Sequence, residues 1–110
     1  MAADAFDLSV PLLEQAVLLA PRDAAARRAL VVALHEVGRG REALTHVREA
    51  IRLDPGDPAD QAFDLANALE AAGDLEGAAD QFRRTIAIDA DQPAAWIRLA
   101  FILSKEGEPA

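Results

Sequence analysis

Apolar residues recur along this chain at the spacing of α-helices. Positions three and four residues apart lie on one face of a helix, so each run of this kind predicts one amphipathic helix. Two such runs are Leu30, Val31, Leu34, Val37 and Ala62, Leu65, Ala66, Leu69. Glycine commonly provides the left-handed residue that ends a helix, and the predicted helix ends are at Gly38, Gly73 and Gly107.

Proline and aspartate predict where several helices begin. Pro58 follows Asp57 and Pro93 follows Gln92, and a proline after a capping residue suits the first turn of a helix. Further helices are expected at residues 41–53 and 75–88, the latter capped by Asp74. Because proline costs no backbone hydrogen bond in a first turn, Pro11 predicts that the first helix starts at Ser9.

The whole chain follows an internal repeat, which decides the architecture. A shift of 34 residues aligns Ala16 with Ala50, Val17 with Ile51, Leu19 with Leu53, Pro21 with Pro55 and Gly73 with Gly107. A shift of 35 residues aligns Gly38 with Gly73, Ala43 with Ala78, Val47 with Phe82, Ile51 with Ile86, Leu53 with Ile88 and Asp54 with Asp89. Each repeat unit therefore consists of two helices and a turn.

These units resemble the tetratricopeptide repeat, a family of 34-residue helix pairs. The last predicted helix comes near the family signature with Trp96, Leu99, Ala100, Leu103 and Gly107. In the middle units the signature is held by Leu30 and Leu65, Gly38 and Gly73, Ala43 and Ala78, and Asp54–Pro55. The tryptophan position is taken by Arg27 and Ala62, while Thr85 and Ala90 stand where the family prefers alanine and proline. The resemblance implies an all-α, right-handed solenoid of antiparallel helix pairs with about six helices.

The phase of the repeat leaves an unfinished unit at each end of a single domain, residues 1–110. Residues 6–21 match only a second helix, residues 24–58 and 59–92 are full repeats, and residues 93–107 match only a first helix. Terminal repeats normally have a polar outer face. The last helix is instead apolar nearly all round, through Trp96, Leu99, Phe101, Ile102 and Leu103. Either the chain is a piece of a longer array or something else covers this helix.

Composition narrows the classes of partner. The 110 residues suffice for one domain, and the 26 alanines and the absence of tyrosine favour helix. A net charge of −8 has the wrong sign for nucleic acid or an anionic membrane. The sequence has no cysteine, no spanning segment and no secretory signal, which fits a cytoplasmic protein. The charge is uneven, since residues 22–52 carry seven arginines and four acids while residues 53–92 carry two arginines and ten acids. A solvated surface with attraction between neighbouring units explains this pattern, and steering of an oppositely charged partner is the alternative.

Candidate catalytic and metal-binding residues are few. The hydroxyls are Ser9, Thr45, Thr85 and Ser104, and none lies in a Gly-x-Ser-x-Gly elbow. His35 and His46 lie on different predicted helices without metal-binding spacing and are expected to be solvated. The aspartates at 54, 57, 60, 89 and 91 lack the pattern of a calcium loop and are explained by helix capping. We therefore expect no enzyme activity, no cofactor and no metal.

The family resemblance implies a concave groove lined by the first helix of each unit. Its groove positions carry Arg28, Val32, His35, Phe63, Asn67, Glu70, Ile97, Phe101 and Ser104. Only Asn67, with Arg28 and Arg98, matches the carboxylate-gripping set of some family members, so a carboxylate clamp is not expected. Phe63 and Phe101 are the expected aromatic anchors for an apolar or amphipathic segment. In the alternative interpretation, Val32, Ile97 and Phe101 belong partly to the core or are covered in a longer array.

The predicted function is a protein-interaction scaffold that holds a peptide or partner helix. An alternative, implied by the resemblance to bacterial-like alanine-rich arrays, is a substrate-recruiting or oligomerisation segment of a larger enzyme such as a transferase. A third prediction is self-association, in which Trp96, Leu99 and Leu103 pack on Leu12, Leu13, Ala16 and Val17. This contact gives an open filament or a ring, whereas a two-fold pairing of the last helices gives a dimer.

Overall fold

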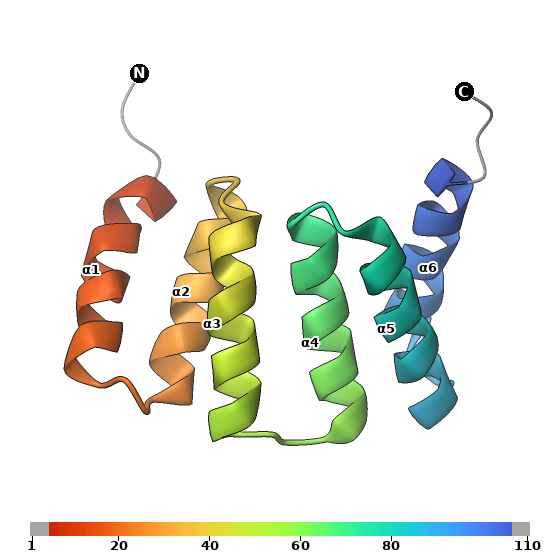
Figure 1. The fold of residues 1–110 in the computed structure, drawn as a ribbon, viewed down its shortest axis with the longest axis horizontal. Helices are drawn as coiled ribbons and strands as arrows, with labels where there is room; N and C mark the ends of the chain where they lie inside the picture. The colour runs from red at the N-terminus through yellow and green to blue at the C-terminus, as the bar shows by residue number, and fades with distance from the viewer. Residues whose placement is uncertain (1–4, 107–110) are drawn as a thin grey trace.

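Six α-helices and short connecting turns make up the described part of the chain (Figure 1). The computed structural model describes residues 5–106, and side chains within residues 8–105. The helices are α1 (Ala5–Leu19), α2 (Ala24–Glu36), α3 (Gly40–Leu53), α4 (Pro58–Ala71), α5 (Leu75–Ile88) and α6 (Pro93–Glu106). The all-α prediction is confirmed, and consecutive helices run in alternating directions side by side in chain order (Figure 1).

The helices pack as consecutive antiparallel pairs. The most extensive contacts join α4 to α5 and α2 to α3, and smaller ones join α1 to α2, α3 to α4 and α5 to α6. The molecule measures 42 × 37 × 19 Å, so its thinnest dimension equals about two helix diameters of 10–12 Å each. This two-layered row of helix pairs is a solenoid, with first helices α2, α4 and α6 and second helices α1, α3 and α5.

Helix ends follow the capping residues of the sequence. Asp57 accepts a hydrogen bond from the Ala59 amide at 2.8 Å and Asp74 accepts one from the Gly77 amide at 2.9 Å, so α4 and α5 begin where predicted. Gly38 and Gly73 have φ values of 79° and 90° after α2 and α4, in the left-handed conformation predicted for them. The predicted cap at Gly107 lies outside the described residues.

The start of the first helix differs from the prediction. α1 begins at Ala5 rather than at Ser9, and Pro11 lies inside it. A proline within a helix removes one backbone hydrogen bond at a cost of about 3 kcal/mol. Val10 is 2% exposed in the core shared with α2, so burial of this face offsets the lost bond and extends the helix before the proline.

Small side chains let the helices approach one another closely. The core contains Ala43, Ala66, Ala78 and Ala95, each fully buried. One core cluster joins α4, α5 and α6 around Phe82, and another joins α1, α2 and α3 around Leu30 and Leu34. Thr85, which stands where the family prefers alanine, is fully buried and donates its hydroxyl to the Gln81 carbonyl at 2.9 Å. Within residues 5–106, no helix has both the length and the apolar character that crossing a membrane requires.

Candidate functional site: a pocket in the concave groove

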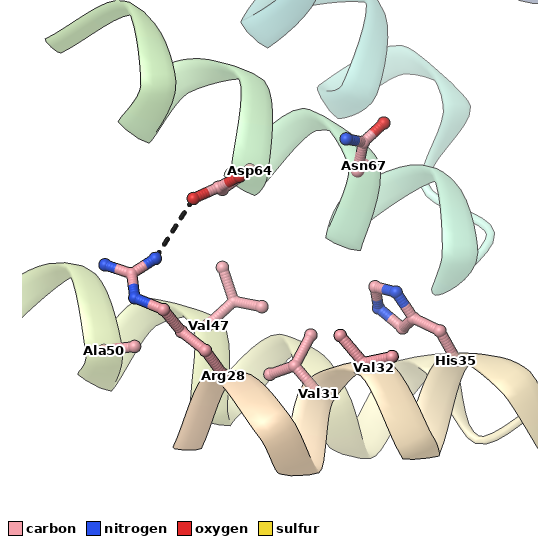
Figure 2. A pocket seen from close by; sticks show the side chains of 8 residues that line it. All are labelled: Arg28, Val31, Val32, His35, Val47, Ala50, Asp64 and Asn67. Atoms are coloured by element: carbon pink, nitrogen blue, oxygen red, sulfur yellow. Dashed lines mark hydrogen bonds and ion pairs between the residues drawn. The ribbon is translucent and has the colours of Figure 1, made fainter. Parts of the chain in front are cut away.

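A pocket of about 270 Å³ lies between α2 and α4, with α3 behind it (Figure 2). Four of its lining residues are groove residues predicted from the sequence: Arg28, Val32, His35 and Asn67. The other four are Val31, Val47, Ala50 and Asp64. Valine and alanine side chains form most of the wall, so the pocket is apolar with a few polar groups at its edges. Its volume suits one or two side chains, since pockets for small-molecule ligands usually measure about 300–1,000 Å³.

An ion pair closes one end of this pocket. Arg28 Nη1 lies 3.1 Å from Asp64 Oδ2, joining α2 to α4 (Figure 2). Arg28 also donates to the Asp54 carbonyl at 3.0 Å. Burial raises the pKa of Asp64, although Arg28 acts in the opposite direction. Since both side chains stay over 40% exposed, we expect this pair to contribute at most about 1 kcal/mol to stability. It attracts the first full repeat to the second, as the uneven charge pattern predicts.

The other end of the pocket carries two polar groups, His35 and Asn67 (Figure 2). His35 Nε2 is buried and has no hydrogen-bond partner. A buried polar atom without a partner loses the free energy of its hydration, so the burial of His35 Nε2 opposes folding. The sequence-based expectation that His35 is solvated is wrong, because its side chain is half-buried against the neighbouring helix.

His46 also differs from the expectation of a solvated residue. It is half-buried, and its Nδ1 lies 3.2 Å from Arg27 Nη1. Burial lowers the pKa of both histidines, and Arg27 lowers that of His46 further. Packing between paired helices buries both histidine side chains. The sequence contains no sign of this burial, because neither histidine lies in a predicted motif. In the part of the chain that the structure describes, no three His, Asp or Glu side chains are arranged to hold a metal ion.

This burial predicts that stability falls as the pH is lowered from 7.5 to 5.5. The unfolded chain takes up protons near pH 6.5, the ordinary pKa of histidine, whereas the folded chain resists protonation. Unfolding is therefore favoured progressively below about pH 6.5. Melting temperatures measured across this range should fall less in a His35→Gln/His46→Gln variant than in the wild type. Equal slopes for the two proteins would contradict the assignment to these histidines.

The remaining predicted groove residues do not join the pocket. Phe63 is half-buried, and its ring meets Phe82 edge to face with centroids 5.8 Å apart. Glu70 on α4 forms an ion pair with Arg98 on α6, with Oε1 3.1 Å from Arg98 Nε. The ring contact therefore joins α4 to α5, and the ion pair joins α4 to α6.

Two of the predicted groove residues are exposed apolar residues on α6. Ile97 is 53% and Phe101 57% exposed, and the Arg98 guanidinium carbon lies 5.8 Å from the centre of the Phe101 ring.

The sequence analysis did not predict Asp64 as a pocket residue. A signal was available, because Asp64 and Arg28 lie on successive first helices and have opposite charges. The contributions of Val47 and Ala50 depend on how α3 packs behind the pocket, and Val31 lines it from α2.

The predicted self-association residues have unequal exposure. On α6, Trp96 is 52% and Leu103 is 40% exposed, and Leu99 is half-buried. On α1, Leu12 is 74% exposed, while Leu13 and Ala16 are half-buried. Val17 is only 7% exposed, because it faces α2 in its own chain, so its assignment to an intermolecular surface is corrected. Leu8, Leu18 and Leu19, which were not predicted, are also exposed.

The row of paired helices, with a pocket between α2 and α4, defines a protein of the helical-repeat class, whose extended surfaces bind other proteins. Two family models, both described as tetratricopeptide repeat, match residues 1–58 and 59–102. The chain belongs to the tetratricopeptide repeat family. A search among curated proteins finds no match.

Solved structures of similar fold include MamA MSR-1 C2, with a TM-score of 0.77 and 20% identity over 94% of this chain. Thermobaculum terrenum O-GlcNAc transferase matches with a TM-score of 0.69 and 26% identity over 89% of this chain and 19% of the transferase. PcrH, solved in complex with the chaperone binding region of PopD, has a TM-score of 0.63 and 23% identity over 91% of this chain and 74% of PcrH. The chain spans 59% of the MamA chain, so the likeness establishes the fold alone.

Proposed function

We propose that this chain is a non-enzymatic scaffold that holds a peptide or helix of a partner protein in its concave groove. The pocket between α2 and α4 is the observation that carries the proposal. Its apolar wall suits an aliphatic side chain, and the Asn67 amide at its edge suits a polar group of a bound backbone. PcrH, a chain of similar fold, was solved with a segment of another protein, which supports a peptide as the ligand.

Peptide selection tests this proposal without a known partner. A phage-displayed library of random peptides is selected on the wild-type chain, and the affinities of the selected peptides are measured by fluorescence anisotropy. Val32, 55% exposed in the pocket wall, is replaced by Glu, and Asn67 is replaced by Ala. We expect Val32→Glu to weaken binding at least tenfold, because a charge would be desolvated against the ligand.

The matched control is Leu18→Glu on α1, at a position 74% exposed and away from the groove. It should leave the affinity unchanged. Selected peptides that bind the two pocket variants as tightly as the wild type would contradict the proposal.

Phe101→Ala tests whether the groove extends onto α6. If Phe101 anchors the ligand, its loss should cost about 2 kcal/mol of binding free energy, roughly thirtyfold in affinity. Because Phe101 is 57% exposed, the fold should persist. Phe63, the other anchor expected from the sequence, is a poor probe because its ring packs on the buried Phe82. An unchanged affinity in Phe101→Ala would confine the binding site to the α2–α4 pocket.

We also propose that copies of the chain associate through their terminal helices. Among the side chains of residues 8–105, ten large hydrophobic ones are exposed, of which four lie on α1 and four on α6. Apolar patches of this kind on a soluble protein mark interaction surfaces. Light scattering after size exclusion tests the proposal, with an expected rise in mass over a hundredfold range of concentration.

A second candidate function is that of a recruiting or oligomerisation segment in a larger enzyme. Its support is the likeness to O-GlcNAc transferase, of which the chain matches 19% of the length. The open reading frame around the coding sequence tests this candidate. A contiguous catalytic domain would favour it, and stop codons at both ends would contradict it.

A further inference from the structure

The complete helix pairs show how a first helix covers its second helix in this protein. In the two complete pairs, three repeat positions on the second helix face the paired first helix and are at most 6% exposed. They are Ala43, Val47 and Ala50 on α3, and Ala78, Phe82 and Thr85 on α5. The same positions on α1, counted 34 residues back from α3, carry Ser9, Leu13 and Ala16, and all three are only half-buried. α1 therefore presents the face on which a first helix packs.

The last helix presents the complementary face. Leu34 on α2 and Leu69 on α4 are 1% and 6% exposed beneath their second helices. Leu103 holds the equivalent position on α6 and is 40% exposed. Ala100, equivalent to the fully buried Ala66, is likewise exposed. α6 thus retains the apolar residues that complete helix pairs bury.

The Trp96 side chain is held by a hydrogen bond to the turn before α6. Its indole Nε1 donates to the carbonyl of Ala90, six residues earlier, at 2.9 Å. Arg27 occupies the equivalent position on α2 and donates through Nε to the carbonyl of Pro21, again six residues earlier, at 3.1 Å. From this anchor Arg27 reaches His46 on its own second helix. On α1 the position equivalent to His46 is Leu12, which is 74% exposed.

Arg27 and His46 thus form a polar contact between the two helices of the first full repeat. The equivalent positions at the two ends of the chain carry the apolar residues Trp96 and Leu12. Resting on the proposed association between copies, we infer that α6 of one copy packs on α1 of the next in the geometry of the internal pairs. Trp96 then covers Leu12, and Leu99 and Leu103 cover the face formed by Ser9, Leu13 and Ala16. The contact is head-to-tail, so a pair of copies still has one free α1 face and one free α6 face, and the assembly grows as a filament or closes as a ring.

Charge favours this polarity over a two-fold pairing of α6 with α6. Residues 1–52 contain seven arginines and seven acidic residues, whereas residues 53–110 contain four basic and twelve acidic residues. The whole net charge of −8 therefore lies in the C-terminal half. Head-to-tail packing places this half beside a neutral one, while two-fold pairing places two strongly acidic halves together, and like charges oppose association.

Two variants with one disabled face each test the polarity. Leu12→Glu disables the α1 face, and Leu103→Glu disables the α6 face. Each variant alone should show the monomer mass in light scattering at concentrations where the wild type associates. An equimolar mixture should form a particle of two chains, because one intact face of each kind remains. Leu18→Glu is the matched control on α1: Leu18 is as exposed as Leu12, and its equivalents Arg52 and Ala87 stay exposed in the complete pairs.

Trp96 reports on the same contact because it is the only tryptophan. Adding Trp96→Phe to the Leu103→Glu chain leaves the indole in the Leu12→Glu chain alone. Mixing the two should shift tryptophan emission to shorter wavelength. Mixing the Leu12→Glu chain with Leu12→Glu/Trp96→Phe chains should not, because neither of these has an intact α1 face.

Three results would overturn the inference. A wild type that remains monomeric over a hundredfold concentration range would remove the association itself. A wild type that associates while Leu12→Glu retains full association would instead favour two-fold pairing of α6 and overturn only the polarity. An equimolar mixture of Leu12→Glu and Leu103→Glu that stays monomeric would likewise overturn the head-to-tail polarity. Far-UV circular dichroism of every variant verifies that the helices persist.

Discussion

Replacing Phe82 by alanine is expected to lower the free energy of unfolding by about 4 kcal/mol, the largest effect of any single side chain considered. Phe82 is fully buried, is the largest such side chain, and meets the Phe63 ring edge to face. Its removal loses the transfer free energy of an aromatic ring and leaves a cavity among α4, α5 and α6. Alanine neighbours such as Ala66 and Ala78 cannot extend into that space.

Urea unfolding followed by far-UV circular dichroism measures this change. Phe101→Ala provides the matched control, since the same substitution is made at a residue 57% exposed on α6, and it should change stability by less than about 1 kcal/mol. Similar losses in the two variants would show that Phe82 does not hold the second repeat and the last helix together.

Gly40→Ala is expected to lower the free energy of unfolding by about 2–3 kcal/mol, the cost of overpacking a close contact. A Cβ atom on Gly40 would meet the backbone carbonyl of Ala71 at the end of α4, 2.5 Å from its carbon atom. Backbone cannot move aside as a flexible side chain does, so the ends of α3 and α4 would have to separate. Helix propensity alone predicts the opposite sign, because alanine is favoured over glycine by about 1 kcal/mol within a helix.

Thermal unfolding of Gly40→Ala beside Gly77→Ala separates these two effects. A Cβ on Gly77 would meet only the Asp74 carboxylate, which can rotate away at the loss of a helix cap worth about 1 kcal/mol, and helix propensity offsets that loss. We expect a clear drop in melting temperature for Gly40→Ala and little change for Gly77→Ala. An increase in the melting temperature of Gly40→Ala would mean that propensity outweighs the contact between α3 and α4.

The sequence by itself determined the helices, the repeat and the family. Helical spacing of apolar residues, aspartates before Pro58 and Leu75, and glycines at 38 and 73 act over a few residues, so they can be interpreted without knowing the fold. The start of α1 was predicted wrongly because a long-range contact outweighs a local signal there. Pro11 gives a local signal for a helix start at Ser9, but burial of Val10 against α2 acts at long range and outweighs it.

Only the tertiary structure decided which predicted residues share a site. Repeat positions predicted nine groove residues, but whether they line a pocket depends on the side chains between two particular helices. Between α2 and α4, valines and a peripheral ion pair leave an open pocket beside His35 and Asn67. On α4, by contrast, the Phe63 ring packs on Phe82 of α5, and Glu70 forms an ion pair with Arg98 of α6. Burial of Val17 and exposure of Leu12 likewise follow from which face of α1 turns toward α2, because packing between helices depends on residues distant in sequence.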